Sequence, residues 1–127
     1  MDPDTNRTYN ELVDLSKLCG GLFLKGLLPF YVLCLLSKEK MYGKQIMDRI
    51  MEMTRGNWKP SPGSIYPMLQ KMERMGLISQ STDPARGLVR VYELTARGRQ
   101  VYLDMREEIK PRLAKTIEVL RLHLAEI

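Results

Sequence analysis

Three prolines fall within the eight residues 60–67, and helical periodicity begins in the same stretch. Ile65, Leu69 and Met72 recur three or four residues apart, which predicts a short helix with one buried face and Gly76 as its C-terminal cap. Proline fixes φ and lacks an N–H donor, so the prolines leave the chain few ways to enter this helix. The stretch therefore predicts a helix whose N-terminal end is held in one orientation.

Pro67 restricts where the regular part of this helix can begin. Its nitrogen cannot donate to the carbonyl oxygen four residues earlier, which disfavours an interior position. Pro67 is tolerated if Ser64 caps the regular helix, because the first N–H groups of a helix have no intrahelical acceptor. Ser61 and Pro62 would then supply an earlier cap and a tight extra turn.

The flanking segments place this helix in a larger order of elements. The predicted helices cover residues 10–23, 26–38 and 42–53, and the predicted strands cover residues 77–81 and 88–94. Asp83 and Gly87 favour a turn between the two strands. The helices at 26–38 and 42–53, the helix that contains Ile65 and Leu69 as the third, and then the hairpin and a long helix form the order of a winged helix-turn-helix. The predicted fold class is mainly α with a small β-hairpin (α+β).

From Tyr102 to Ile127, the C-terminal segment has apolar residues at intervals of three or four over seven successive steps. Thr95 is positioned to cap this helix, and Pro111 inside it should produce a kink or mark a junction. Such a long and narrow seam exceeds what a small domain can cover, so it predicts pairing of two copies as in a coiled coil. The predicted dimerisation residues are Tyr102, Met105, Ile109, Leu113, Ile117, Leu120 and Leu124.

These patterns divide the 127 residues into three parts. We expect residues 1–24 to form a helical extension that supports the dimer, because its amphipathic face at 10–23 has no core of its own to cover. Residues 25–95 would form the winged helix-turn-helix domain, and residues 96–127 would form the dimerisation helix.

Positive charge is concentrated in the middle of the chain. The formal net charge is +5, and residues 38–99 alone carry twelve Lys and Arg against six Asp and Glu, a net +6. A compact basic module suits a polyanionic partner such as double-stranded DNA, although basic composition also serves solubility. The polar face of the third helix and the arginines of the hairpin are suited to bases and phosphates. These residues are Ser61, Ser64, Tyr66, Gln70, Lys71 and Arg74 on the helix, and Arg86 and Arg90 on the hairpin.

Some of these residues have a structural interpretation as well. Tyr66 either contacts DNA or packs half-buried on the hairpin, and Lys71 belongs either to the interface or to a solvated face. Trp58, the only tryptophan, is expected to anchor the loop before the third helix in the core.

Other classes of protein are poorly supported. His123, the only histidine, has leucine on either side, and no nucleophile, base and orienting group can be assembled around it, so we expect no enzyme. Cys19 and Cys34 lie in apolar segments without metal-ligand spacing, which predicts a reducing, cytoplasmic environment and neither metal nor cofactor. The most apolar stretch has 15 residues and contains Lys25 and Pro29, which is too short and interrupted for a membrane span.

Three segments carry a family resemblance. "MYGKQIMDRI", "WKPSPGSIYPMLQKMERMGLI" and "RVYELTARGRQVY" together resemble the PadR family of transcriptional regulators over about residues 22–104. The resemblance implies a winged-helix repressor that dimerises through its C-terminal helix and binds a palindromic operator. It matches Ser61, Gly63, Tyr66 and Pro67 to the entrance of the recognition helix, Tyr42 and Gly43 to the start of the second helix, and Tyr92, Leu94, Thr95 and Gly98 to the strand-to-helix junction.

Lys59 before the recognition helix and Lys44 at the start of the second helix complete the candidate DNA-binding set. Some members of the family bind planar aromatic compounds, so a small hydrophobic effector is a further expected partner. The alternative is a winged-helix module that binds other proteins through its long helix and has no DNA-binding role. The basic bias and the polar face of the third helix favour DNA.

Overall fold

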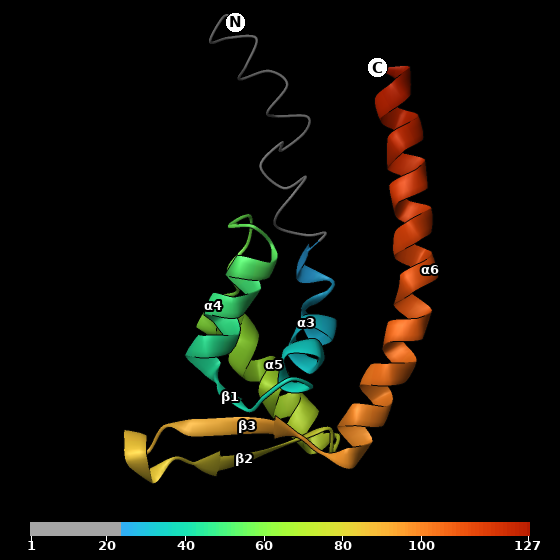
Figure 1. The fold of residues 1–127 in the computed structure, drawn as a ribbon. Helices are drawn as coiled ribbons and strands as arrows, with labels where there is room; N and C mark the ends of the chain where they lie inside the picture. Colours follow the sequence, from blue (N-terminus) through green and yellow to red (C-terminus); the bar gives the residue numbers. More distant parts are fainter. Residues whose placement is uncertain (1–23) are drawn as a thin grey trace, which may run out of the picture.

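The computed structural model describes residues 24–127 (Figure 1). The elements are α3 (Leu28–Leu36), β1 (Met41–Tyr42), α4 (Gly43–Met53), α5 (Pro62–Arg74), β2 (Ile78–Thr82), the 3-10 turn η2 (Pro84–Arg86), β3 (Arg90–Leu94) and α6 (Ala96–Glu126). This order confirms the predicted winged helix-turn-helix with a long C-terminal helix. The helix expected at 10–23, and with it nearly all of the extension expected at 1–24, lies outside the described residues.

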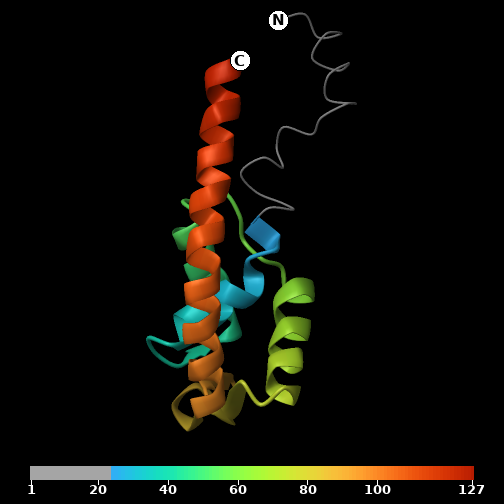
Figure 2. The same cartoon turned by 90° about the vertical axis from the view of Figure 1, so that its right-hand side faces the viewer.

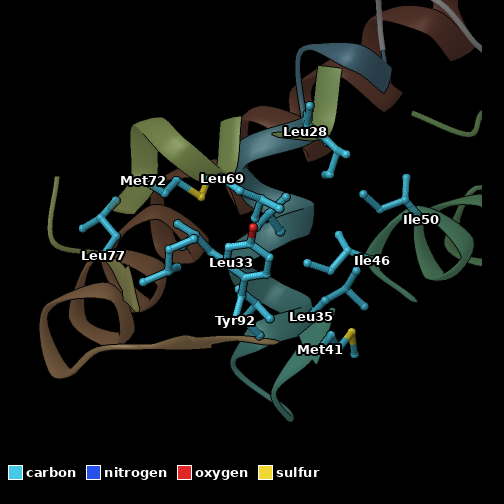
Figure 3. Packing of buried hydrophobic residues seen from close by; sticks show 14 of the residues in the cluster. Leu28, Leu33, Leu35, Met41, Ile46, Ile50, Leu69, Met72, Leu77 and Tyr92 are labelled. Atoms are coloured by element: carbon cyan, nitrogen blue, oxygen red, sulfur yellow. The ribbon is translucent and has the colours of Figure 1, made fainter. Parts of the chain in front are cut away.

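Helices α3, α4 and α5 build the core. Leu33 from α3, Ile46 and Ile50 from α4, and Ile65 and Leu69 from α5 are all fully buried. Figure 3 shows these helices converging on one apolar cluster, which Tyr92 of the sheet closes on one side. Ile65 and Leu69, whose spacing predicted α5, thus lie on its buried face.

The sheet has three strands in the order β1-β3-β2, whereas the sequence predicted only a two-stranded hairpin. Met41 pairs with Tyr92, and Tyr42 pairs with Val91. Tyr42 was expected at the start of the helix over residues 42–53, and two residues are too few to show the alternation of a strand. Their strand character comes from pairing with β3, about fifty residues further along the chain.

The entrance to α5 differs from the prediction. Ser61 holds the N-cap position with extended backbone (φ −81°, ψ 161°), the helix begins at Pro62, and Ser64 lies inside it. Pro67 is therefore an interior proline. Because proline has no N–H, the carbonyl oxygen of Gly63 lacks the donor that an ordinary residue 67 would provide. The expectation that Ser64 caps the regular helix was wrong, since the helix already begins at Pro62 with Ser61 as its N-cap.

The end of α5 is as predicted. Gly76 adopts a positive φ of 74°, and its N–H donates to the carbonyl oxygen of Glu73 over 3.0 Å. The N–H of Leu77 donates to the carbonyl oxygen of Met72 over 2.9 Å. These two bonds form a Schellman motif, in which glycine supplies the left-handed residue.

Helix α6 begins at the predicted cap and stands beside the other helices (Figure 2). The Thr95 hydroxyl accepts a hydrogen bond from the N–H of Gly98 over 3.0 Å. Pro111 does not end the helix, which runs unbroken from Ala96 to Glu126. Tyr102 is buried and Met105 is partly buried against the core of the same chain. Among residues 24–127, no helix has both the length and the apolar character that crossing a membrane requires.

Candidate nucleic-acid interface

A groove lies between α5 and the wing, by which we mean residues 78–94 with β2, η2 and β3. Its volume is about 770 Å³. Three elements provide its walls: the start of α4, the exposed face of α5, and the turn of the wing with β3. The lining residues are Tyr42, Gly43, Lys44, Tyr66, Gln70, Arg86, Leu88, Val89, Arg90 and Tyr92. This wing groove brings together predicted site residues from positions 42 to 90.

Tyr66 fixes the position of α5 against the start of α4. A β-carbon on residue 43 would lie 2.7 Å from the Tyr66 hydroxyl oxygen and 2.8 Å from its ring, so any residue larger than glycine would require this ring to move. The Tyr66 side chain nevertheless keeps 40% of its surface exposed in the groove. The ring therefore packs against the start of α4, and its exposed part lines the groove together with residues of the wing.

Arg86 is held in the groove by two partners. Its Nε lies 4.0 Å from the Asp83 carboxylate, and its guanidinium lies over the Tyr42 ring at 5.1 Å from the centroid. The same carboxylate accepts a hydrogen bond from the N–H of Ala85 over 3.0 Å, which stabilises η2. A guanidinium positioned in this way loses less side-chain entropy when it binds an anion.

The electrostatics of the wing groove favour an anionic ligand. Lys44 and Arg90 are exposed, and neither forms an ion pair with another residue in the 24–127 range. Tyr92 is buried at the base of the groove, and this burial raises the pKa of its phenol above the usual value. Tyr92 therefore stays neutral at physiological pH and does not oppose the positive charge around it.

Two predicted site residues lie elsewhere. The Lys59 ammonium lies 2.9 Å from the Asp48 carboxylate of α4, and its hydrogen bond lowers the pKa of Asp48. Lys71 lines a different cavity of about 190 Å³, which lies between α3, α5 and α6 and includes Met68 and Met75. The structure therefore offers Lys59 a carboxylate partner and places Lys71 on another side of α5 from Gln70.

The remaining predicted residues lie at the entrance of α5. Ser61, Gly63 and Pro67 are exposed, and the Ser61 hydroxyl lies 3.3 Å from that of Ser64. None of these four residues lines the wing groove. Trp58 packs as expected against the core, with its ring 6.4 Å from that of Tyr31.

Sequence reasoning missed the apolar tip of the wing. Leu88 and Val89 fall within the predicted strand 88–94, but β3 begins only at Arg90. Leu88 is 89% exposed and lines the groove opposite α5. The sequence indicated that Leu88 lies at the turn, because it directly follows the turn residue Gly87. In the structure Gly87 adopts a φ of 73°.

The predicted dimerisation seam divides into two parts. Tyr102 and Met105 pack within their own chain, and the Tyr102 hydroxyl lies 3.5 Å from Cys34 Sγ. Further along α6 the seam emerges from the domain, as Figure 1 shows for the C-terminal half of the helix. The exposed fractions of the last seam residues are 50% for Ile117, 55% for Leu120 and 71% for Leu124.

The sequence of the chain matches a known protein family. Residues 32–104 match the family described as "Transcriptional regulator PadR-like family". The chain belongs to this family. Membership confirms the predicted resemblance, and the family's description is that of transcriptional regulators.

Two relatives illustrate the match. The chain is 32% identical over 103 residues to the "Transcriptional regulator YqjI" of Escherichia coli, with 72% of this chain and 49% of that protein covered. It thus spans about half the length of the curated relatives it matches. The structure of Bacillus subtilis PadR in complex with operator DNA is 30% identical with a TM-score of 0.55, covering 62% of this chain and 45% of that one.

Other solved structures share the fold over a larger fraction of their length. The putative transcriptional regulator TA0346 from Thermoplasma acidophilum is 26% identical with a TM-score of 0.64, covering 76% of this chain and 93% of that chain. A transcriptional regulator from Clostridium thermocellum, at 22% identity and a TM-score of 0.65, covers 74% and 88% and shows the fold alone. The winged helix with its long C-terminal helix is therefore shared by proteins of different organisms.

Proposed function

We propose that the protein is a sequence-specific DNA-binding transcriptional regulator, and that it acts as a dimeric repressor on a palindromic operator. The observation that carries this proposal is the wing groove, where Lys44, Arg86 and Arg90 surround the exposed polar face of α5. A positively charged groove beside an exposed helix face combines the two requirements of specific DNA binding. Phosphate contacts supply affinity, and side chains at base edges supply sequence discrimination.

In this proposal α5 enters the major groove. Gln70 and Tyr66 are exposed on the face of α5 that lines the groove, where they can reach base edges. An amide such as that of Gln70 can pair with adenine through two hydrogen bonds. Lys44, Arg86 and Arg90 are assigned to the phosphates of the strand that borders the major groove. The solved complex of Bacillus subtilis PadR with operator DNA supports DNA as the partner.

A palindromic operator follows from pairing through α6. The exposed seam residues Ile117, Leu120 and Leu124 would cost free energy in water, and a second copy of the helix would cover them. A twofold dimer presents two identical recognition helices, so its operator has two half-sites of inverted sequence. We place this activity in the cytoplasm.

We further propose that a small hydrophobic effector relieves repression. The cavity between α3, α5 and α6 is lined almost entirely by apolar side chains, among them Met68, Met72, Met75 and Met105. Methionine side chains adapt to ligands of different shape. Because the cavity touches both the recognition helix and the long helix, occupancy would act on their relative position.

The central test is selection of bound sequences from a random DNA pool, followed by titration of the selected DNA and of unrelated DNA at a fixed salt concentration. We expect an inverted repeat, bound about 10³-fold or more tightly than unrelated DNA. Equal binding of both DNAs, or no binding, would support the protein-interaction module instead. In that case, light scattering would still find a dimer, because the α6 seam does not depend on DNA.

A further inference from the structure

Leu88 is an apolar side chain at an exposed position between two arginines of the wing. It lies at the tip of the wing with 89% of its surface exposed, between Arg86 and Arg90. Exposed apolar surface costs free energy in water, and no side chain of the described region covers this leucine. Single exposed leucines are common on proteins, and this one is distinguished by its position at the tip of a basic wing.

The tip that presents Leu88 is held by the backbone. The N–H of Asp83 donates to the carbonyl oxygen of Val89 over 3.1 Å and closes the turn just beyond Leu88. Inside the turn, the Asp83 carboxylate accepts from Ala85, and Gly87 adopts φ 73° and ψ −133°, a conformation that essentially only glycine adopts. Leu88 therefore projects from a turn with a defined conformation.

The wing groove determines which part of DNA this tip would meet. In a duplex, a single sugar–phosphate strand separates the major groove from the adjacent minor groove. With Gln70 and Tyr66 of α5 facing the major groove, that strand lies in the wing groove against Lys44 and Arg90. Leu88 lines the groove from the tip of the wing, whereas Gln70 and Tyr66 line it from α5, so a strand held between wing and helix would separate Leu88 from α5. The Leu88 side chain is then directed into the minor groove.

We infer that Leu88 packs against the floor of the minor groove and selects A·T or T·A over G·C at the base pairs beneath the wing. This inference rests on the proposed DNA-binding function. In the minor groove, G·C differs from A·T by the N2 amino group of guanine, a hydrogen-bond donor. A leucine over that group would bury a donor without an acceptor, whereas the A·T floor lacks it. Apolar side chains, leucine included, occupy the minor groove in other DNA-binding proteins.

The test uses the full chain and an operator selected from random DNA. Single A·T pairs are replaced along the operator by G·C and, in parallel, by inosine·C, which has the major-groove edge of G·C but lacks the N2 amino group. Beneath the wing we expect G·C to weaken binding by the wild-type protein about tenfold, a typical cost for one unfavourable base pair. Inosine·C should bind about as tightly as A·T at the same position.

Leu88→Ala should reduce the penalty for G·C to less than about threefold, because the shorter alanine side chain no longer covers the amino group. Its unfolding midpoint in urea should match the wild type, because Leu88 contributes to no packed core. Met51→Ala is the matched control: Met51 is 41% exposed near the far end of α4 from the groove, and this variant should keep the tenfold penalty.

Two results would overturn the inference while leaving operator binding intact. One is a Leu88→Ala variant that keeps the wild-type penalty for G·C. The other is an inosine·C penalty as large as that of G·C, which would place the discrimination in the major groove. Failure of the proposed function looks different, because the wild-type protein would then bind selected and unrelated DNA alike, and the role of Leu88 would fall with it.

Discussion

The Thr95 hydroxyl donates a hydrogen bond of 2.6 Å to the carbonyl oxygen of Gly76. This bond joins the N-cap of α6 to the glycine that terminates α5. A second bond, from the N–H of Thr95 to the carbonyl oxygen of Leu77 over 3.0 Å, reinforces it. The long helix is therefore attached directly to the end of the proposed recognition helix.

Gly98 should be irreplaceable at this junction. A β-carbon on residue 98 would overlap the backbone carbonyl group of Leu77, which cannot move without displacing the start of β2. We expect Gly98→Ala to lower the free energy of unfolding by about 1–3 kcal/mol, measured by urea denaturation. Gly63→Ala is the control: its β-carbon would meet only the Ser61 hydroxyl at 3.7 Å, so higher helix propensity should raise stability by up to about 1 kcal/mol.

Thr95→Val tests the hydroxyl at nearly constant shape. The change removes the cap on Gly98 and the donor to Gly76, and should cost about 1–2 kcal/mol of unfolding free energy. Thr95→Ser keeps the hydroxyl and should stay within about 0.5 kcal/mol of the wild type. Equal stability of the valine and serine variants would show that these hydrogen bonds contribute little.

The exposed seam of α6 predicts a dimer that depends on apolar contact. Leu113→Glu combined with Leu120→Glu should yield monomers or unfolded protein, because pairing would bury unpaired carboxylates. Light scattering at micromolar concentration measures the result. Lys115→Glu makes the same change in net charge outside the seam and should leave the dimer intact, because its exposed ion pair with Glu118 contributes little. A monomeric wild-type protein would contradict the proposal.

Wing and helix variants should separate affinity from specificity. Arg86→Ala and Arg90→Ala are expected to weaken binding to operator and unrelated DNA alike, and to reduce the slope of log K against log salt by about 0.9 for each phosphate that is no longer neutralised. Gln70→Ala should instead narrow the difference between the two DNAs by about 1–3 kcal/mol. Lys59→Ala should have the smallest effect, since Lys59 is already paired with Asp48. Loss of specificity in the wing variants alone would contradict this docking.

Alkaline pH should unfold the protein partly through Tyr92. Burial raises the pKa of this phenol, so the folded state favours the neutral form more than the unfolded state does. The resulting stability is complete below about pH 10, the usual pKa of tyrosine, and is lost as pH rises through the higher folded value. Urea midpoints at pH 8 and 10.5 should therefore differ less in Tyr92→Phe than in the wild type. An unchanged difference would assign the alkaline loss to other groups.

Local patterns were sufficient for most of the fold. Periodicity located α4 because Ile46 and Ile50 recur on one face, and Gly76 and Thr95 marked the end of α5 and the start of α6 through their capping chemistry. Strand β1 could not be predicted, because its two residues become a strand only by pairing with Val91 and Tyr92. Such pairing depends on how distant segments pack.

The candidate site was predictable to a similar extent. Sequence spacing identified the exposed face of α5 but could not resolve its edges, so Lys71 was grouped with Gln70 although it lines another cavity. The partner of Lys59 lies eleven residues earlier on α4, and no local pattern indicates that contact. Leu88 was missed because an apolar residue next to β3 resembles the strand that follows it.

The unbroken course of α6 has a consequence for the geometry of the operator. Its 31 residues form about 46 Å of continuous helix, with the wing nearer its first residues and the exposed seam toward its last ones. An insertion into the helix between them would turn the seam by about 100° per residue, whereas seven added residues would restore its facing to within about 20° and lengthen the helix by about 10 Å. In the proposed dimer, the number of base pairs between half-sites would thus be set by a segment that lies away from the proposed DNA interface. Relatives with identical grooves can diverge in operator spacing through insertions and deletions in this helix alone.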